Sequence, residues 1–317
     1  MARRKKPKHG QCFQFLAFLA VYLILQIIRI TPLRIGVRVS RGLGRLGYYF
    51  AHKRRRIAID NLRYVFLGVK SENELRLIAR RSFSSFVTAG FEAVKFIPLL
   101  SKPDGYPVIQ RHCKGLDALF LKASELHHQS GGCIFVTPHL GNWEFLPFVS
   151  FGAGIAMVMV VRPLDNPYLE KLLYQQRLAS GQIIIPKTNS MHLLQLALRR
   201  GKSVAMLPDQ ATMKAISVDY LGRKATTTPV PAFLAVRYHR PIVVVACCRK
   251  SNDFDYEGMV SDPIWPDPRG SEKPEIVRLT KLMNREMGDL VKRFPEQYLW
   301  MHDRWKQYRH KNELTLA

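Results

Sequence analysis

Residues 133–144 read CIFVTPHLGNWE, and this stretch decides the fold. Its first five residues are apolar or β-branched with no polar alternation, which predicts a short strand buried on both faces. Four further runs of the same kind lie at 156–161, 183–185, 203–207 and 242–247. Stretches with helical periodicity separate them, at 168–179, 191–200 and 231–238. Alternating strands and helices predict an α/β fold in which helices flank a mixed central sheet.

The chain before this stretch has a mainly helical pattern. Ser71, followed by two glutamates, predicts a helix start, and apolar residues keep helical spacing from Leu75 to about Phe96. Shorter helices are predicted at 33–49, 53–66 and 116–127. Because the sequence contains no internal repeat and no long linker, we expect residues 31–317 to form a single α/β domain with a helical N-terminal part.

The composition is that of a globular protein with an unusual charge. Of the 317 residues, 47% are hydrophobic and 23% charged, which excludes collagen-like, disordered and polytopic membrane proteins. Lys and Arg number 49 against 24 Asp and Glu, a formal net charge of +25. Residues 1–63 hold fifteen Lys and Arg and a single acid, Asp60. Such an excess predicts anionic partners.

Next to this basic start lies an uncharged apolar segment, Cys12–Ile28. As a helix it would be about 25 Å long, near the lower limit for crossing a bilayer core of roughly 30 Å. No small-residue cleavage site follows it, so we interpret residues 1–30 as a basic N-terminus with an uncleaved membrane-anchor helix. Basic residues flank both ends, so spanning and in-plane anchoring both remain open. This arrangement favours membrane phospholipid over nucleic acid as a partner.

The five cysteines show no CxxC spacing and are typical of a reducing compartment. Cys133 and the Cys247–Cys248 pair lie in strand-like runs, where small buried hydrophobes are expected. His127 and His128 have no second cluster at metal-ligand spacing. We therefore expect no metal and no cofactor.

In α/β sheets the chemistry gathers at the carboxyl ends of strands, here in the turns after Thr137, Val161 and Leu207. The first turn holds His139 and Glu144, which would be about 140° apart on a continuous helix. Pro138 and Gly141 supply the bend that can bring them together. A histidine oriented by a carboxylate is a general base, and amides such as those of Gly141 and Asn142 can face an oxyanion.

Each of these residues also has a purely structural interpretation. His139 can cap a turn, with Glu144 as a surface acid, and Asn142 can stabilise the turn through its side chain. Asp209 can be a helix N-cap. Arg162 can bind an anionic substrate or pair with Asp165. Gly-x-Ser-x-Gly is absent and no Ser or Cys lies in the first turn, which favours direct attack by a substrate hydroxyl over an acyl-enzyme.

Five blocks taken in order resemble one family, the bacterial lipid A biosynthesis acyltransferases, which include lauroyl and myristoyl transferases within the wider lysophospholipid acyltransferase-like group. They read RIAIDNL at 56–62, TPHLGNWE at 137–144, VRPLDNP at 161–167, MLPDQ at 206–210 and EQYLWMHDRWK at 296–306. The resemblance extends over most of the chain.

The resemblance implies transfer of a fatty acyl chain from acyl carrier protein, or from acyl-CoA, to a hydroxyl of a glycolipid acceptor, a lipid A precursor. It places the enzyme at the cytoplasmic face of the inner membrane. It also implies that His139 is the general base with Glu144 as its partner, and that Arg162 and Asp209 border the site. An acidic carrier and a phosphorylated glycolipid would both suit the basic surface.

The chain departs from the family at residues 218–229, which read VDYLGRKATTTP. Gly222 and Arg223 match the family pattern and are expected at the substrate site, but the preceding aromatic residues are reduced to Tyr220. Donor chain length and acceptor identity therefore stay open. One alternative is the same chemistry on another lipid, such as a phosphatidylinositol mannoside or a lysophospholipid. The other is a non-catalytic, basic membrane-binding protein.

Overall fold

A six-stranded sheet forms the centre of the protein in the computed structural model, which describes residues 10–100, 107, 117–155, 157–161, 164–179, 181–186, 189–212, 215–250 and 255–308. The strand order is β3-β2-β4-β1-β7-β8. Its strands are β1 (Ile134–Val136), β2 (Met157–Val161), β3 (Ile183–Pro186), β4 (Ser203–Met206), β7 (Ile242–Arg249) and β8 (Tyr256–Val260). The first five are parallel, and β8 is antiparallel to β7, so the predicted mixed α/β sheet is confirmed.

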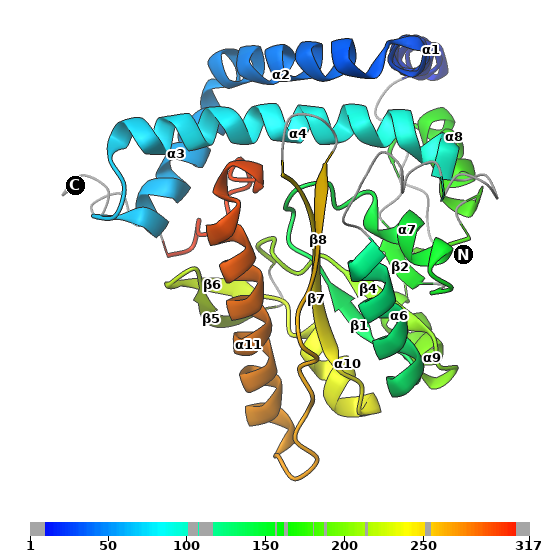
Figure 1. Ribbon diagram of the computed structural model, residues 1–317, viewed down its shortest axis with the longest axis vertical. Coiled ribbons are helices and arrows are strands. Elements are labelled where there is room, and N and C mark those ends of the chain that lie inside the picture. Colours follow the sequence, from blue (N-terminus) through cyan, green and yellow to red (C-terminus); the bar gives the residue numbers. More distant parts are fainter. Residues whose placement is uncertain are drawn as a thin grey trace.

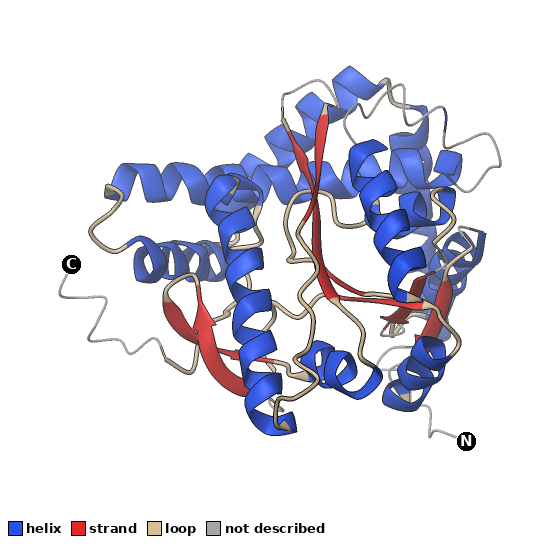
Figure 2. Ribbon diagram, turned by 60° about the horizontal axis from the view of Figure 1, so that its bottom comes forward, coloured by secondary structure: helices blue, strands red, loops and turns tan. Residues whose placement is uncertain are grey.

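Both faces of the sheet are covered, which explains why the strand sequences are continuously apolar. Along β7, Ile242, Val244 and Ala246 belong to one buried cluster, and Val243 and Val245 belong to the other. The first cluster includes residues of α9 (Ser190–Arg199), α10 (Val230–Tyr238) and α11 (Glu272–Arg293). The second includes residues of α6 (Asp117–Ser130) and α7 (Leu146–Gly152). Figure 2 shows helices on either side of the twisted strands.

The N-terminal helices lie beyond one edge of the sheet. They are α1 (Gln11–Ile30), α2 (Leu33–Phe50), α3 (His52–Phe66) and the long α4 (Glu72–Leu100). Figure 1 shows α2 running along α4, on the side of α4 away from the sheet, with α1 beside the end of α2. The predicted start of α4 is confirmed, since Ser71 and Glu74 form reciprocal side-chain to backbone hydrogen bonds of 2.8 and 3.4 Å.

The helices α7 and α11 were not predicted, and neither were two strand elements. One is an antiparallel hairpin of β5 (Ile216–Tyr220) and β6 (Arg223–Thr227), which is separate from the main sheet. The other is the edge strand β8. The remaining helix, α8 (Pro167–Ala179), and the short 3₁₀ turn η1 (Pro295–Gln297) complete the described elements.

Small residues bring α2 close to α4. Gly36, Ser40 and Gly44 recur every four residues on the buried side of α2, and Ser40 hydrogen bonds Thr88 at 3.1 Å. A Cβ on Gly44 would overlap the backbone of Ser84. Close helix approach through such a stripe is common where helices associate in membranes.

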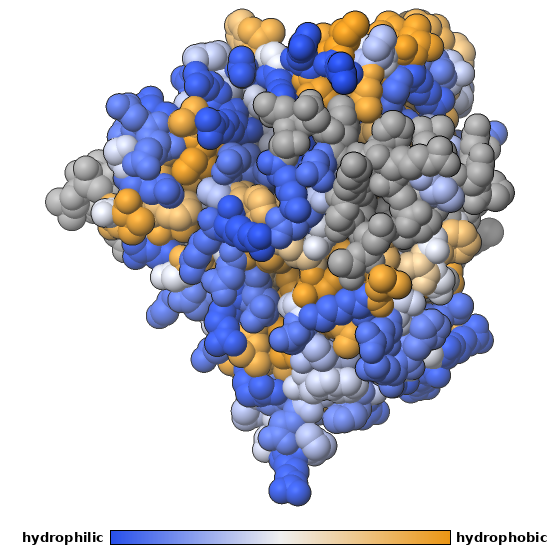
Figure 3. Space-filling view, viewed as in Figure 1, coloured by the Kyte–Doolittle hydropathy of each residue, from blue (hydrophilic) through white to orange (hydrophobic). Residues whose placement is uncertain are grey.

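The opposite side of α2 is apolar and exposed, at Ile35, Val39, Leu43, Leu46 and Phe50. The neighbouring α1 is long and apolar enough to cross a membrane, by length and composition alone, and little of it is buried against the rest of the protein. In Figure 3, hydrophobic residues appear along the top of the molecule, where Figure 1 places α1 and α2.

Candidate active site

Strand register brings His139 and Asp209 together. Val136 of β1 pairs with Met206 of β4 in the parallel ladder. Both strands end at that pair, and three residues further along the chain lie His139 in one turn and Asp209 in the other. Because both strands point the same way, the two side chains emerge at the same carboxyl edge of the sheet. That edge faces α4.

The contact between the two residues is close and largely buried. The imidazole Nδ1 of His139 lies 2.6 Å from Oδ1 of Asp209, and the backbone N–H of His139 donates to Oδ2 at 2.8 Å. The Asp209 side chain is 2% exposed and that of His139 is 16% exposed. A carboxylate only accepts, so Nδ1 carries the proton and Nε2 is the nitrogen with the lone pair.

The Nε2 side of the ring faces the surface. The side-chain amide nitrogen of Gln210, an exposed residue, donates to Nε2 of His139 at 3.2 Å. Trp143 meets the imidazole edge to face, with ring centroids 5.2 Å apart, and stacks on Phe86, which is 45% exposed. The imidazole of His139 therefore contacts a polar amide at Nε2 and an apolar aromatic pair through its ring.

The pKa values of His139 and Asp209 are shifted in opposite directions, as expected for a base and its carboxylate partner. Burial favours a neutral His139, but the charge of Asp209 and its hydrogen bond outweigh burial, with a smaller contribution from Glu144, and raise the pKa of His139 above 6.5. Burial would raise the pKa of Asp209, yet the imidazole and the charge of Arg304 hold that pKa below its ordinary value. Burial lowers the pKa of the neighbouring His302.

Glu144 does not hold the imidazole as predicted. It is exposed, and among the described hydrogen bonds the Nδ1 partner of His139 is Asp209. The reason is geometric, because the turn after His139 leads the chain away along the sheet edge, whereas the adjacent strand ends directly beside the ring. Asp209, predicted at the border of the site, is at its centre.

The predicted oxyanion amides are already bonded within the protein. The N–H of Gly141 donates to the carbonyl of Gln297 at 3.1 Å, and the N–H of Asn142 donates to the carbonyl of Cys247 at 2.8 Å. Gly141 has φ of 64°, and a Cβ there would overlap the Cys247 carbonyl oxygen. The turn is therefore hydrogen bonded to β7 and to the C-terminal segment. These amides do not point at a substrate.

Asn142 makes a structural contact, which is with α4 and not within the turn. Its side chain is fully buried and donates from Nδ2 to Glu92 of α4 at 3.0 Å. Glu92 also pairs with Arg249 at the end of β7, at 2.7 Å. The predicted substrate contact of Asn142 is thus replaced by a buried network that fixes α4 against the turn.

Two of the other predicted site residues lie in the hairpin. Gly222, with φ of 79°, forms its turn. The guanidinium of Arg223 donates from Nε to the carbonyl of Tyr64 in α3 at 2.6 Å and lies over the Tyr64 ring. Arg223 therefore ties the hairpin to α3. Arg162 lies outside the described residues.

The C-terminal segment is part of the site's support, and its role was not predicted. Leu299 donates its N–H to the carbonyl of His139 at 3.0 Å. Asn61 in turn donates from its side chain to the carbonyls of Trp300 and His302, at 2.9 and 2.7 Å. Two of the five sequence blocks, 56–62 and 296–306, thus meet behind the turn. In the sequence, these blocks indicated the family through their order along the chain. That order does not reveal that they contact each other.

The fold and the site define an α/β protein that carries a histidine–carboxylate pair at the carboxyl end of its parallel strands. Residues 3–307 match the bacterial lipid A biosynthesis acyltransferases, and the chain belongs to this family.

Its similar curated proteins include two from Escherichia coli (strain K12). The chain is 24% identical to lipid A biosynthesis lauroyltransferase over 295 residues, 92% of both chains, and 24% identical to lipid A biosynthesis palmitoleoyltransferase over 267 residues, 83% of this chain and 82% of the relative. It is also 22% identical to a lipid A biosynthesis acyltransferase of Haemophilus influenzae over 289 residues, 90% of this chain and 85% of that relative.

Proposed function

We propose that this acyltransferase moves a fatty acyl chain from acyl carrier protein, or from acyl-CoA, to a hydroxyl of a lipid A precursor, with His139 as the general base. The observation that carries the proposal is the buried Asp209 carboxylate on Nδ1, which leaves Nε2 able to accept a proton. The family membership supports the reaction type.

The reaction is a direct transfer. Nε2 of His139 takes the proton of the acceptor hydroxyl as that oxygen attacks the thioester carbonyl. Asp209 stabilises the imidazolium that forms. When the tetrahedral intermediate collapses, the C–S bond breaks, the new ester remains, and His139 returns its proton to the leaving thiolate. The acceptor hydroxyl replaces the Gln210 amide at Nε2 of His139, and that amide can then hydrogen bond the hydroxyl or the oxyanion. The amides of Gly141 and Asn142 do not do so, because they are bonded within the protein.

The acyl chain has an apolar surface next to the base. Phe86 and Trp143 form a stacked pair against the imidazole, and Leu207, 38% exposed, follows β4 beside the same edge. Burial of an acyl chain contributes about 0.8 kcal/mol for each methylene. We therefore place the first carbons of the donor chain along this pair.

We also propose that α1 and the exposed side of α2 hold the enzyme at the cytoplasmic face of the inner membrane. The apolar residues of α2 and the basic residues on its flanks suit a helix at the bilayer interface. A lipid acceptor would then reach His139 without leaving the membrane surface.

His139→Ala tests the proposed base. We expect acyl transfer from labelled acyl carrier protein to lipid A precursor to fall by about 10²- to 10⁴-fold, because a positioned general base contributes roughly that much. The matched control is His192→Ala, which removes an exposed histidine of α9 and should leave the rate unchanged. Equal turnover by His139→Ala and the native enzyme would refute the mechanism.

Mass spectrometry of the product separates the acceptors. Labelled acyl chains should appear on the lipid A precursor and not on lysophospholipid or phosphatidylinositol mannoside offered under the same conditions. If the label appears on another lipid, the proposed mechanism stands but the proposed acceptor is wrong.

A further inference from the structure

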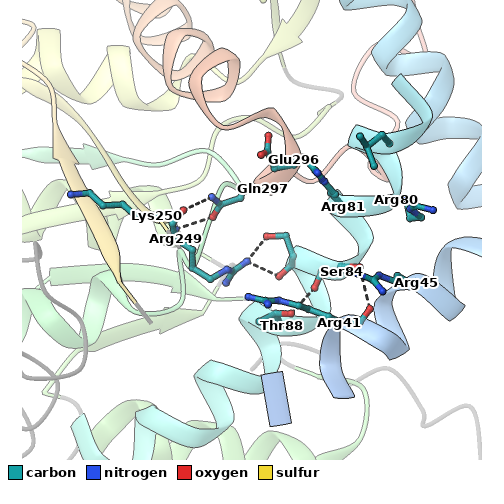
Figure 4. A pocket seen from close by; sticks show the side chains of 12 residues that line it. Arg41, Arg45, Arg80, Arg81, Ser84, Thr88, Arg249, Lys250, Glu296 and Gln297 are labelled. Atoms are coloured by element: carbon teal, nitrogen blue, oxygen red, sulfur yellow. Dashed lines mark hydrogen bonds between the residues drawn. The ribbon is translucent and has the colours of Figure 1, made fainter. Parts of the chain in front are cut away.

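A basic cavity of about 630 Å³ lies between α2, α4 and the end of β7. Its volume is within the usual range for sites that bind small molecules. Its charged lining residues come from three places: Arg41 and Arg45 from α2, Arg80 and Arg81 from α4, and Arg249, Lys250 and Glu296 from the β7 end and η1 (Figure 4). None of the sequence blocks that indicated the family lies in α2 or in this part of α4.

Several of these cations form no ion pair with a carboxylate in the part of the chain that the structure describes. Among the described residues, Arg45, Arg80 and Arg81 form no salt bridge, whereas Arg249 is paired with Glu92. Glu296 is the single acid in the described lining. Arginines that converge on one space repel each other, and a bound anion relieves that repulsion. The cavity therefore suits an anionic ligand.

The donors that remain for a ligand are mainly guanidinium groups. The hydroxyl of Ser84 donates to the carbonyl of Arg41, and that of Thr88 donates to the carbonyl of Ser84, so these lining hydroxyls are already committed. Guanidinium groups match the oxygens of a phosphate in a bidentate fork. A concave site of this size fits a headgroup better than the flat face of a protein helix.

The position of the cavity connects it with both the membrane surface and the active site. Arg41 and Arg45 lie on α2, whose other side exposes Val39, Leu43 and Leu46. Long basic side chains on such a helix reach lipid phosphates. At the opposite wall, the backbone carbonyl of Gln297 accepts from the N–H of Gly141. The Gln297 side chain donates to the carbonyl of Arg249 at 2.8 Å and accepts from the N–H of Arg249 at 2.9 Å.

We propose that this arginine cavity binds a phosphate group on the acceptor lipid, so that the enzyme selects phosphorylated acceptors. The inference rests on the proposed function, because it assigns the phosphate to the lipid whose hydroxyl reaches His139. An acidic carrier protein that docked on the same arginines would give a different result in the experiment below.

The kinetic experiment compares two double variants of the full chain that remove the same charge. Arg45→Ala/Arg81→Ala alters the cavity, and Arg269→Ala/Arg285→Ala alters two arginines that do not line it. With a phosphorylated acceptor, we expect the cavity variant to raise the acceptor KM about tenfold or more, because charge-assisted hydrogen bonds are lost, while kcat and the donor KM stay near native. With phosphatase-treated acceptor, the cavity variant and the native enzyme should match.

Two kinetic outcomes would overturn the proposal. A raised donor KM with an unchanged acceptor KM would identify the cavity as a carrier-protein site. Equal kinetic constants for the cavity variant and the control variant would exclude it as a substrate site.

A binding experiment with His139→Ala chain does not depend on turnover. Calorimetry in detergent would compare dihexanoyl phosphatidic acid, hexanoic acid and inorganic phosphate. We expect phosphatidic acid to bind most tightly and to lose about tenfold or more in affinity when Arg45 and Arg81 are also replaced. Equal affinity for hexanoic acid, or for inorganic phosphate, would refute a lipid-phosphate site. If phosphatidic acid binds as expected while no variant transfers acyl chains, the cavity stands and the proposed function fails.

Discussion

His139 depends on a carboxylate seventy residues further along the chain. The sequence predicted the histidine from its place at a strand end, but it assigned the carboxylate by local spacing and chose Glu144. Asp209 could be considered only as a border residue, because nothing local reveals which strand neighbours β1. Once the order β4-β1 is known, the register pair Val136 and Met206 identifies the partner.

The pH dependence of kcat/KM tests this assignment. The pKa of His139 is raised above 6.5, and the base must be neutral, so native kcat/KM should fall as the pH drops through that raised pKa. In Asp209→Asn the raising charge is gone and burial remains, so the acidic limb should move to lower pH. The rate at neutral pH should also fall about 10²-fold or more, because the amide no longer fixes the tautomer.

Glu144→Gln is the matched control for that profile. Its charge acts on His139 without a hydrogen bond, so the acidic limb should move less and the rate should fall less than in Asp209→Asn. If Glu144→Gln has the larger effect on rate and pH profile, the exposed carboxylate, and not Asp209, is the partner in the working enzyme.

At the scale of elements, the five parallel strands were predictable because burial on both faces leaves an uninterrupted apolar run. The hairpin and β8 were not. Residues 223–227 read RKATT, and β8 reads YEGMV with a glycine at its centre, so neither has the apolar run that marked the other strands. The hairpin is held instead by tertiary contacts, including the buried Arg304, which donates to the Thr226 carbonyl and, at 2.7 Å, to the Thr227 hydroxyl.

Gly44→Ala tests the close packing of α2 on α4. The new methyl group would overlap Ser84, so we expect a loss of about 1–3 kcal/mol in the free energy of unfolding. Gly42→Ala is the control on the same helix, since its Cβ would meet open space and should stabilise by roughly 0.5–1 kcal/mol through helix propensity. Denaturant unfolding measures both. Equal effects at the two positions would mean that α2 is not packed on α4 as described.

Considered as a whole molecule, the protein has most of the large exposed apolar residues of its described part on α1 and α2, at one end of the structure, together with five arginines. The sequence predicted a membrane anchor from residues 12–28 and a basic surface from residues 1–63. It did not predict that the small residues of α2 would face inward and its large residues outward. Contact with α4 sets this orientation, because α4 can approach closely only where α2 carries glycine or serine.

Leu43→Trp tests whether this end contacts lipid. In vesicles that contain brominated phospholipids, the added tryptophan should be quenched by at least about half relative to unbrominated vesicles, because position 43 is on the exposed apolar side of α2. Arg269→Trp, in the loop between β8 and α11 at the bottom of Figure 1, should show little added quenching over the parent chain. Similar quenching at both positions would contradict an oriented membrane contact.

The shared register of β1 and β4 also limits how such enzymes can be recombined. His139 and Asp209 each stand three residues past a paired position, so deleting one residue from either turn would displace one side chain by about 3.3 Å along its strand direction. A hydrogen bond of 2.6 Å does not survive that displacement. Chimaeras with relatives that differ in the length of either turn must therefore exchange both turns together.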